Sequence, residues 1–316
     1  MQVPRVNASQ IADARERIRG VVTRTPLVPA GALEGGKMYL KLECLQPTGS
    51  FKVRGAWNRM SRSDEEERRK GFVTVSAGNH GAAVAWCARK LGASCAVYVP
   101  EDAVQRKVVS MERLGAKIER RPHREIMDSM ADDRMLKLGM TFIHPFADPY
   151  VVAGQGTIGL EILDDLPSVR TLVVPVGGGG LINGIAQSIK RTRPDIKIFG
   201  VQAEGAAPLP KSLASGVPED VGAPKTIADG IGATQVYDYM LPLFKENLAG
   251  AFTVSDQEIR GAMKQLMFES HIVPEPAGAA GLAGALKHRT ELQEPIVCVI
   301  SGGNVDPRLA AEVLTS

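Results

Sequence analysis

Short runs of apolar, β-branched residues alternate along the chain with segments of helical periodicity, and this alternation restricts the possible folds more than any other feature. The predicted strands are Met38–Glu43, Phe72–Val75, Cys95–Val99, Thr141–Ile143, Thr171–Val176, Ile196–Val201 and Ile296–Ile300. The predicted helices are Ser9–Ile18, Asn79–Leu91, Ala103–Leu114, Glu125–Leu138, Gly156–Leu163, Leu181–Arg191, Asp256–Glu269 and Ala277–Leu286. Strands that alternate with helices form parallel sheets covered by helices on both faces. The sequence therefore predicts an α/β fold whose central strands precede Gly177 and Ser301.

The chain length of 316 residues is enough for about two domains of roughly 150 residues each. Glycine and proline mark two points, near Gly71 and around residues 145–149, that bracket a smaller insert. We therefore predict a larger domain formed by residues 1–70 and 148–316. Residues 71–147 are predicted to form a smaller domain that the chain enters and leaves.

Charge and hydropathy exclude several classes of protein. Lys and Arg number 38 against 35 Asp and Glu, and the signs are interspersed, which argues against nucleic acid as a partner. Apolar runs are far shorter than the roughly 20 residues of a membrane-spanning helix, so no membrane partner is expected. The N-terminal segment lacks an apolar signal region. The four cysteines lack CxxC spacing, which predicts buried thiols and a cytoplasmic location: Cys44, Cys87, Cys95 and Cys298.

Two glycine-containing segments resemble nucleotide-binding motifs without matching them. Residues 31–37 fit GxxxxGK, but Met38 stands where a Ser or Thr would hold magnesium, so a turn before a strand is expected. The run from Gly177 to Gly184 contains no GxGxxG in any register, which weakens a dinucleotide interpretation.

The glycine run Gly177–Gly180 is nevertheless a strong candidate for an anion site. It follows a predicted strand directly and precedes the helix predicted from Leu181. Successive residues without Cβ atoms let backbone N–H groups converge at the positive end of a helix dipole, where a phosphate fits. A plain tight turn is the alternative, but a turn needs only one glycine.

Lys52 is the candidate nucleophile. It lies between Phe51 and Val53 in a Gly- and Ser-marked loop before a helix, so its amine can be partly desolvated. Desolvation lowers the pKa of an amine and makes it reactive toward a carbonyl. Taken alone, a solvated loop lysine is the simpler interpretation. Together with a phosphate site, this lysine indicates an aldehyde that carries a phosphate, which is pyridoxal phosphate.

Three further segments lie at predicted strand ends or helix starts. Ser76–Gly81 can offer free N–H groups to a carboxylate, with Ser76 as a helix cap. Ser301–Asn304 follows a central strand, where ligands of parallel sheets bind. Glu275 begins a helix with an acid at its positive end, and a cap alone is its simpler interpretation. A capping turn is the simpler interpretation of Ser76–Gly81 taken alone. Together with Lys52 and the glycine run, however, these segments supply partners for an aldehyde, a phosphate and a carboxylate.

These segments resemble those of fold type II, β-family pyridoxal-phosphate enzymes, the group of serine/threonine dehydratases and serine racemase. The similarity runs from Thr23 to Asp306 and rests on Thr48–Ala56 (TGSFKVRGA), Ser76–Gly81 (SAGNHG), Gly154–Thr157 (GQGT), Gly177–Leu181 (GGGGL) and Ser301–Asn304 (SGGN). The resemblance implies two open, doubly wound, mostly parallel sheets, a larger cofactor domain, and a smaller mobile domain that closes over the substrate. It also implies pyridoxal 5'-phosphate as cofactor, a small amino-acid substrate and a homodimer.

The resemblance further implies a role for each matching residue. Lys52 would bind the cofactor aldehyde and move the substrate α-proton. Phe51 would pack beside the ring and Asn79 would hydrogen-bond its hydroxyl. The phosphate would be held by backbone N–H groups of Gly177, Gly178, Gly179, Gly180 and Leu181. Ser301 would face the pyridine nitrogen, near Gly230 and Glu275. The substrate carboxylate would be bound by Ser76, Ala77, Gly78, Asn79 and His80.

Ser301 bears on the reaction type. A hydroxyl cannot keep the pyridine nitrogen protonated, so the ring is a weaker electron sink and a long-lived carbanion is disfavoured. This favours β-elimination from L-threonine or L-serine, in which water is lost and a 2-oxo acid and ammonia are released. The sequence thus predicts a pyridoxal-phosphate-dependent ammonia-lyase.

Two departures from the group weigh against alternatives. Ala77 stands where serine racemases carry the serine that acts on the face opposite the lysine, and racemisation needs a proton donor on each face. Glu204 matches one acid of the group's cation site without a second acid nearby, so no metal is predicted. Serine racemase and a 3-hydroxyaspartate or phenylserine dehydratase stay open. A second carboxylate could meet Arg121 or Arg124, whose simpler role is on a solvated face.

Overall fold

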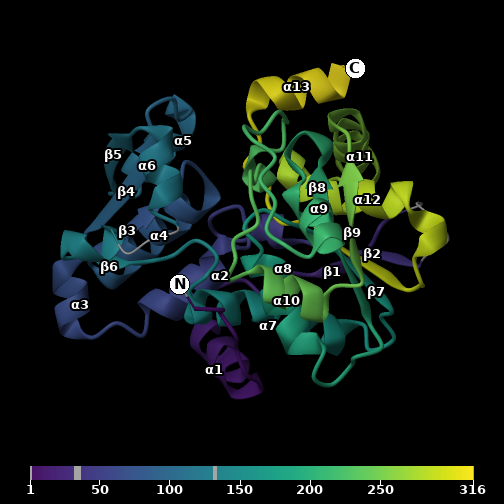
Figure 1. The fold of residues 1–316 in the computed structure, drawn as a ribbon, viewed down its shortest axis with the longest axis horizontal. Helices are drawn as coiled ribbons and strands as arrows, with labels where there is room; N and C mark the ends of the chain where they lie inside the picture. Colours follow the sequence, from purple (N-terminus) through teal and green to yellow (C-terminus); the bar gives the residue numbers. More distant parts are fainter. Residues whose placement is uncertain (1, 32–36, 131–133, 316) are drawn as a thin grey trace.

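The protein is described by a computed structural model that covers residues 2–31, 37–130 and 134–315. Within these ranges the larger sheet has the strand order β1-β2-β10-β7-β8-β9. Its strands are β1 (Leu27–Pro29), β2 (Met38–Lys41), β10 (Ile296–Val299), β7 (Thr171–Pro175), β8 (Lys197–Ala203) and β9 (Gly250–Val254). All neighbours pair in parallel except β1 with β2, which pair antiparallel. Figure 1 shows this sheet on the right of the molecule.

The smaller sheet, on the left in Figure 1, has the order β5-β4-β3-β6 and its pairs are parallel. Its strands are β3 (Phe72–Val75), β4 (Cys95–Pro100), β5 (Lys117–Arg121) and β6 (Thr141–Phe142). These strands all fall within the predicted insert. The described chain therefore has the predicted α/β architecture of two mostly parallel sheets.

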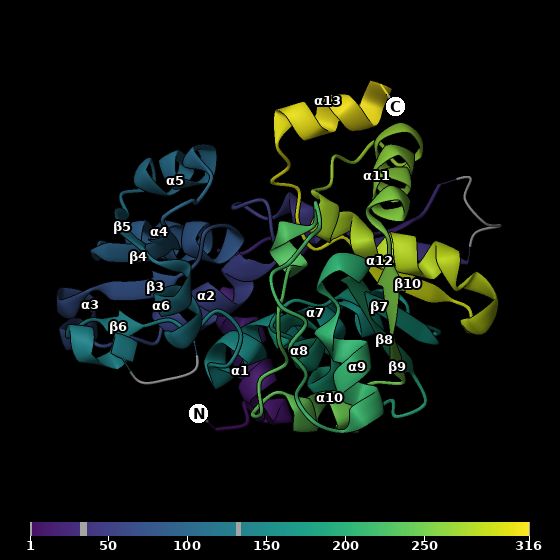
Figure 2. The same ribbon diagram turned by 45° about the horizontal axis from the view of Figure 1, so that its top comes forward.

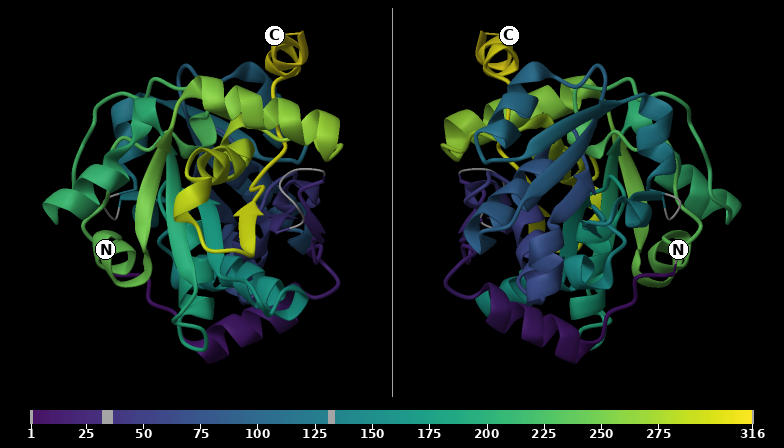
Figure 3. Two further views of the ribbon diagram at one scale, coloured as in Figure 1. Left: turned by 90° about the vertical axis from the view of Figure 1, so that its right-hand side faces the viewer. Right: turned by 90° about the vertical axis from the view of Figure 1, so that its left-hand side faces the viewer.

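Helices cover the sheets and connect their strands, as Figures 2 and 3 show from other sides. The α-helices are α1 (Ala8–Ile18), α2 (Lys52–Met60), α3 (Glu65–Lys70), α4 (Asn79–Leu91), α5 (Gln105–Glu112), α6 (His123–Asp128), α7 (Pro149–Asp165), α8 (Gly180–Ile189), α9 (Pro208–Ser215), α10 (Leu241–Asn247), α11 (Asp256–Glu269), α12 (Pro276–Lys287) and α13 (Pro307–Thr315). Short 3-10 helices are η2 (Glu43–Leu45), η3 (Arg134–Leu138), η4 (Glu204–Ala206), η5 (Asp229–Ile231) and η6 (Arg289–Glu291). No described helix is long and apolar enough to span a bilayer.

The central strands of the larger sheet are buried on both faces. Side chains alternate along a strand, so Val173 and Cys298 join the core under α11 and α12, whereas Leu172 and Val297 join the core under α7 and α8. Every residue of β7 and β10 is buried. The prediction of doubly covered central strands is confirmed.

Several predicted elements differ from the structure. Strands β1, β5 and β9 were not predicted, and β5 (KIERR) is a polar edge strand that only its pairing with β4 identifies. The helix predicted over 125–138 is wrong, because α6 ends at Asp128 and a 3-10 helix occupies 134–138. Residues 131–133 of that prediction, and 32–36 of the turn predicted before Met38, lie outside the described residues. The thiols of Cys87, Cys95 and Cys298 are buried as predicted, whereas Cys44 is half-buried.

A buried ionic cluster fixes α2 to the larger sheet. Arg54 Nε lies 2.7 Å from Glu43 Oε2, and its Nη1 lies 2.7 Å from Glu161 Oε1 on α7. Lys41 Nζ on β2 lies 2.5 Å from the other oxygen of Glu161. All four side chains are almost fully removed from solvent, so each charge depends on its partners. The cluster anchors the helix that begins at Lys52.

Candidate active site

A cavity of about 370 Å³ lies between the two sheets and is lined by segments far apart in the sequence. It brings together every residue predicted for the site: Phe51, Lys52, Ser76, Ala77, Gly78, Asn79, His80, Gly177, Gly178, Gly179, Gly180, Leu181, Gly230, Glu275 and Ser301. Most of these residues follow strands β3, β7 and β10 at their carboxyl ends, where parallel sheets bind ligands.

Lys52 is the first residue of α2; it is half-buried and lines the cavity. Its Nζ donates to the carbonyl oxygen of Pro145 at 2.9 Å and lies 5.2 Å from the Phe51 ring centroid. Burial lowers the pKa of Lys52 to about 8. A fraction of the amine is therefore in its neutral, nucleophilic form near neutral pH, and the interpretation as a solvated loop lysine is wrong.

The glycine run connects β7 to α8 and is packed so tightly that side chains do not fit. A Cβ on Gly178 would lie 2.3 Å from Phe146 Cδ1, and one on Gly180 would lie 2.9 Å from Phe146 Cα. Gly179 has φ +92°, a left-handed conformation that turns successive N–H groups to one side. This cradle at the start of a ten-residue helix fits a phosphate group.

We predict that Gly179→Ala raises the Kd for pyridoxal phosphate by roughly tenfold or more, because it combines left-handed strain with a clash. The new Cβ would lie 2.3 Å from Phe244 Cζ. Gly222→Ala is the matched control, since its φ is +75° and nothing lies within 4 Å. Absorbance titration of cofactor-depleted protein measures both affinities. Equal Kd values for the two variants would contradict the role of the cradle.

The turn between β3 and α4 differs in detail from the prediction. The N-cap of α4 is Gly78, and Ser76 Oγ accepts a hydrogen bond from Gly78 N at 3.1 Å, so the prediction that Ser76 caps the helix is wrong. His80 Nε2 lies 3.1 Å from the carbonyl oxygen of Ile143, and Nδ1 has no hydrogen-bond partner among the described residues. Burial holds the pKa of His80 well below its usual value. His80 is thus a neutral group on the cavity wall.

Glu275 connects two of the predicted segments instead of capping a helix. It occupies the N-cap position of α12 but makes no capping bond with its side chain, so the simpler interpretation as a cap alone is wrong. Its Oε1 accepts from Asn79 Nδ2 at 2.6 Å, and Asn79 Oδ1 accepts from Asn304 Nδ2 at 2.8 Å. Burial raises the pKa of Glu275 to about 7, although the Asn79 bond opposes the shift. Ser301 Oγ is 3.4 Å from the carbonyl oxygen of Ala277.

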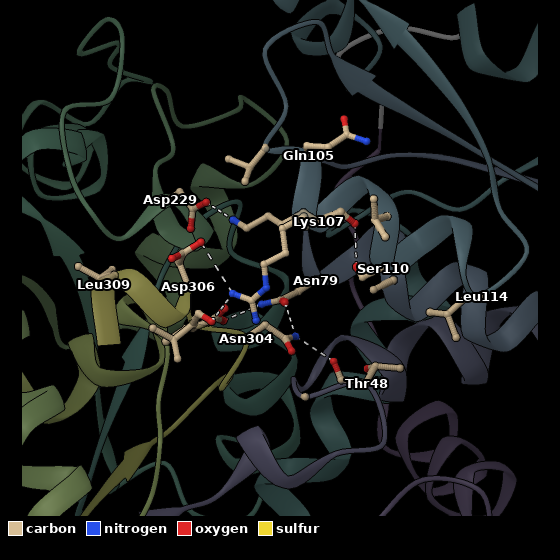
Figure 4. A pocket seen from close by; sticks show the side chains of 18 of the residues that line it. Thr48, Asn79, Gln105, Lys107, Ser110, Leu114, Asp229, Asn304, Asp306 and Leu309 are labelled. Atoms are coloured by element: carbon tan, nitrogen blue, oxygen red, sulfur yellow. Dashed lines mark hydrogen bonds and ion pairs between the residues drawn. The ribbon is translucent and has the colours of Figure 1, made fainter. Parts of the chain in front are cut away.

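An outer cleft of about 720 Å³ adjoins the cavity, and both are lined by Asn79, Lys107, Asp229 and Glu275. Figure 4 shows Lys107 of α5 pointing across this cleft to Asp229 of η5, with which it forms an ion pair. The sequence motifs did not identify Lys107 and Asp229 as part of the site. They also missed Pro145 and Phe146, because no local sequence pattern marks any of these four residues as neighbours of the site.

Three residues considered from the sequence lie elsewhere. Arg124 is exposed, and neither it nor Arg121 lines the cavity. Arg121 pairs with Glu119 at 3.4 Å. Glu204 Oε1 lies 3.3 Å from Lys287 Nζ, and the described residues contain no cluster of acids, histidines or cysteines suited to a metal.

Comparisons with known proteins agree with this arrangement. Residues 18–302 match the family model described as pyridoxal-phosphate dependent enzyme. The chain is 39% identical to the L-threonine ammonia-lyase of Thermotoga maritima, over 98% of this chain and 78% of the relative. The structure of maize serine racemase is similar with TM-score 0.89 and 34% identity, covering 98% and 97% of the two chains. The structure of a T.th. threonine deaminase is similar with TM-score 0.88 and 35% identity, covering 95% and 99%.

Proposed function

Because the chain belongs to the family of pyridoxal-phosphate-dependent enzymes, we propose that it is an ammonia-lyase for a small β-hydroxy amino acid. It removes water from L-threonine or L-serine and gives a 2-oxo acid and ammonia. The observation that carries the proposal is the convergence of the Lys52 amine, the glycine cradle and the Ser301 hydroxyl on one cavity that also contains Ala77. The likeness to a threonine ammonia-lyase over nearly the whole chain supports it.

Pyridoxal phosphate is the cofactor, and the residues of the cavity fit it. The cradle at Gly177–Leu181 would hold the phosphate, Lys52 would hold the aldehyde carbon, and Ser301 would face the pyridine nitrogen. Phe51 and Gly230 would flank the ring. Asn79 would face the ring hydroxyl, since only one of its two amide hydrogens is needed for Glu275. The chemistry that the bound cofactor supplies is stabilisation of negative charge at the substrate α-carbon.

Lys52 performs the proton transfer. Its neutral amine takes the proton from the α-carbon, because a pKa of about 8 leaves part of the population uncharged near neutral pH. The resulting ammonium can return that proton to the departing β-hydroxyl. The substrate carboxylate would be bound at Ser76–His80, where the free N–H groups of a 13-residue helix begin.

The cavity wall favours elimination over racemisation. Ala77 presents a methyl group, which neither accepts nor donates a proton, in the segment that faces the substrate. Without that second acid–base group, a proton removed by Lys52 is not replaced from the opposite face. The structural likeness to maize serine racemase concerns the fold that both reactions share.

The side chain of the substrate is inferred from the charges on the wall. Among the described residues that line the cavity there is no arginine, and Lys107 is already paired with Asp229. A second carboxylate, as in 3-hydroxyaspartate, would therefore lack an unpaired cation to neutralise it. This supports the short hydroxy side chains of serine and threonine.

The smaller unit, residues 71–147, is proposed to close over the substrate. The outer cleft separates it from the larger unit, and the Lys107–Asp229 pair crosses that cleft (Figure 4). The larger unit, residues 1–70 and 148–316, would carry the cofactor. A homodimer, which the family resemblance implies, and a cytoplasmic location, which the cysteine pattern predicts, belong to the same proposal.

The test is release of 2-oxo acid from L-threonine, L-serine, D-serine, phenylserine and the 3-hydroxyaspartates, with chiral analysis of the remaining amino acid. We expect release from L-threonine or L-serine to exceed any racemisation by far. Arg124→Ala serves as a control that leaves every rate unchanged. Racemised serine without 2-oxo acid would overturn the proposal in favour of an isomerase, and preference for a 3-hydroxyaspartate would overturn the substrate assignment.

A further inference from the structure

The carbonyl group that holds Lys52 belongs to a turn that is organised around a buried histidine. His144 lies between β6 and α7 and is only 5% exposed. Its Nδ1 accepts two backbone hydrogen bonds, from Phe146 N at 3.2 Å and from Ala147 N at 2.9 Å. Its Nε2 lies 3.3 Å from the carbonyl oxygen of Met130. Both ring nitrogens are therefore engaged.

These contacts determine the protonation state of the imidazole. A nitrogen that accepts two N–H groups carries no proton, so the proton of His144 is on Nε2, which donates to Met130. A positively charged ring would present a third N–H to the two backbone donors. Burial and the charge of Lys52 lower the pKa of His144 to about 4, which agrees with the neutral tautomer.

The geometry of one peptide group connects His144 to Lys52. The N–H of Phe146 and the C=O of Pro145 belong to the same planar peptide unit and point in opposite directions. His144 Nδ1 holds the N–H side of this unit, and the C=O side accepts from Lys52 Nζ at 2.9 Å. The imidazole therefore sets the direction of the carbonyl that receives the lysine amine.

The same turn also contacts the glycine cradle. The ring of Phe146 packs on Gly178, and its Cα lies against Gly180. The Phe146 ring meets the His144 ring edge-on, with centroids 4.7 Å apart. A rotation of the Pro145–Phe146 peptide would thus displace the Lys52 amine and the wall beneath the phosphate site together.

We propose that His144 is a positioning residue: its Nδ1 acceptor orients the Pro145–Phe146 peptide, which in turn places the Lys52 amine for the reaction. The inference deepens the proposed function, because the amine placed in this way is the one that moves the substrate proton. It concerns the acceptor atom rather than the ring. That distinction makes the inference testable.

Substitutions at 144 separate acceptor from ring. In His144→Asn, Oδ1 occupies nearly the place of Nδ1 and can accept from the N–H groups two and three residues ahead, as asparagine does in turns. His144→Leu matches asparagine in shape without an acceptor. His144→Phe keeps a ring without an acceptor. Phe142→Leu is the control for lost packing, since its ring meets that of His144 at 5.6 Å outside the turn.

The measurements are the visible circular dichroism of the cofactor in each purified holoenzyme, kcat and KM for 2-oxo acid release, and Tm. We expect the leucine and phenylalanine variants to lose the cofactor dichroism and about 100-fold in kcat, with KM little changed, and the asparagine variant to stay within about threefold. Phe142→Leu should lower Tm and leave the dichroism intact. If the His144→Phe variant does not fold, the comparison of His144→Asn with His144→Leu still tests the inference.

Two results would overturn the inference. One is a phenylalanine variant that performs better than the asparagine variant, which would show that the ring is what matters. The other is an equal loss of kcat and cofactor dichroism in His144→Asn and His144→Leu that parallels their decrease in Tm, as a purely structural role would produce. Cofactor dichroism does not depend on the reaction catalysed. If the ammonia-lyase proposal is wrong, no variant releases 2-oxo acid, but the expected pattern of dichroism among the variants is still observed. That outcome is therefore distinguishable from a failure of the inference about His144.

Discussion

Lys52→Ala should lower 2-oxo acid release by roughly 10³-fold or more, since it removes both the covalent attachment to the cofactor and the acid–base group. No neighbouring lysine that the structure describes is placed to take over the role of Lys52 in this variant. Among the described residues of the cavity wall the other lysine is Lys107, which is paired with Asp229 on the cleft side. Borohydride trapping followed by mass spectrometry should find cofactor on the wild-type peptide that contains Lys52 and none on the variant.

Two controls give this result its meaning. Lys70→Ala removes an exposed lysine on α3 that pairs with Glu66, and it should leave both activity and trapping unchanged. Lys52→Arg keeps the positive charge but presents a guanidinium that stays protonated, so it should be as inactive as alanine. Activity retained in the arginine variant would mean that charge alone, rather than a neutral amine, serves the reaction.

The second large effect is expected in stability. Arg54→Met should lower the free energy of unfolding by about 3–5 kcal/mol, because it leaves the carboxylates of Glu43 and Glu161 buried without their main partner. Arg54 Nε and Nη1 are each 2.7 Å from one of these groups. Lys41 remains paired with Glu161 and acts on Glu43 more weakly than Arg54, whose charge and hydrogen bond are the main influences that hold the pKa of Glu43 down against burial. Urea and thermal denaturation measure the loss.

Arg15→Met is the matched control for this prediction. Arg15 pairs with Asp164 at 2.5 Å, but both side chains are about two-fifths exposed, at 40% and 42%. An exposed pair contributes at most about 1 kcal/mol, so this variant should unfold close to the wild-type midpoint. If both methionine variants shifted the midpoint equally, the burial of the Arg54 cluster would not be the cause.

The predictions from sequence succeeded where local pattern and tertiary burial coincide. Strand β3 and helices α4 and α11 have the predicted bounds. A run of buried β-branched residues is sufficient to identify the strand, and a helical period of apolar residues is sufficient to identify the helices. Edge strand β5 could not be found in this way, since KIERR lacks an apolar face and its pairing with β4 creates the strand. The strand conformation of β5 depends on its pairing with β4, which lies about 20 residues earlier in the sequence.

The candidate site shows the same division. Motifs located Lys52, the glycine run and Ser301, because each depends on special residue types next to a strand or helix end. They could not show that Glu275 bonds to Asn79, since 196 residues separate the two. They also missed His144, whose importance comes from two backbone N–H groups rather than from any neighbour in a motif. Hydrogen bonds of this kind exist only after the chain has folded.

The strand order of the larger sheet also bears on how the protein is made. The smaller sheet uses only residues 72–142, so it can assemble as soon as that stretch has left the ribosome. Strand β10, by contrast, lies between β2 and β7 but follows all the other described strands in the sequence. Until it arrives, β2 and β7 each present an open hydrogen-bonding edge to the surroundings. The central part of this sheet therefore cannot close before β10 has been synthesised, and until then the nascent chain is exposed to mispairing at these two edges.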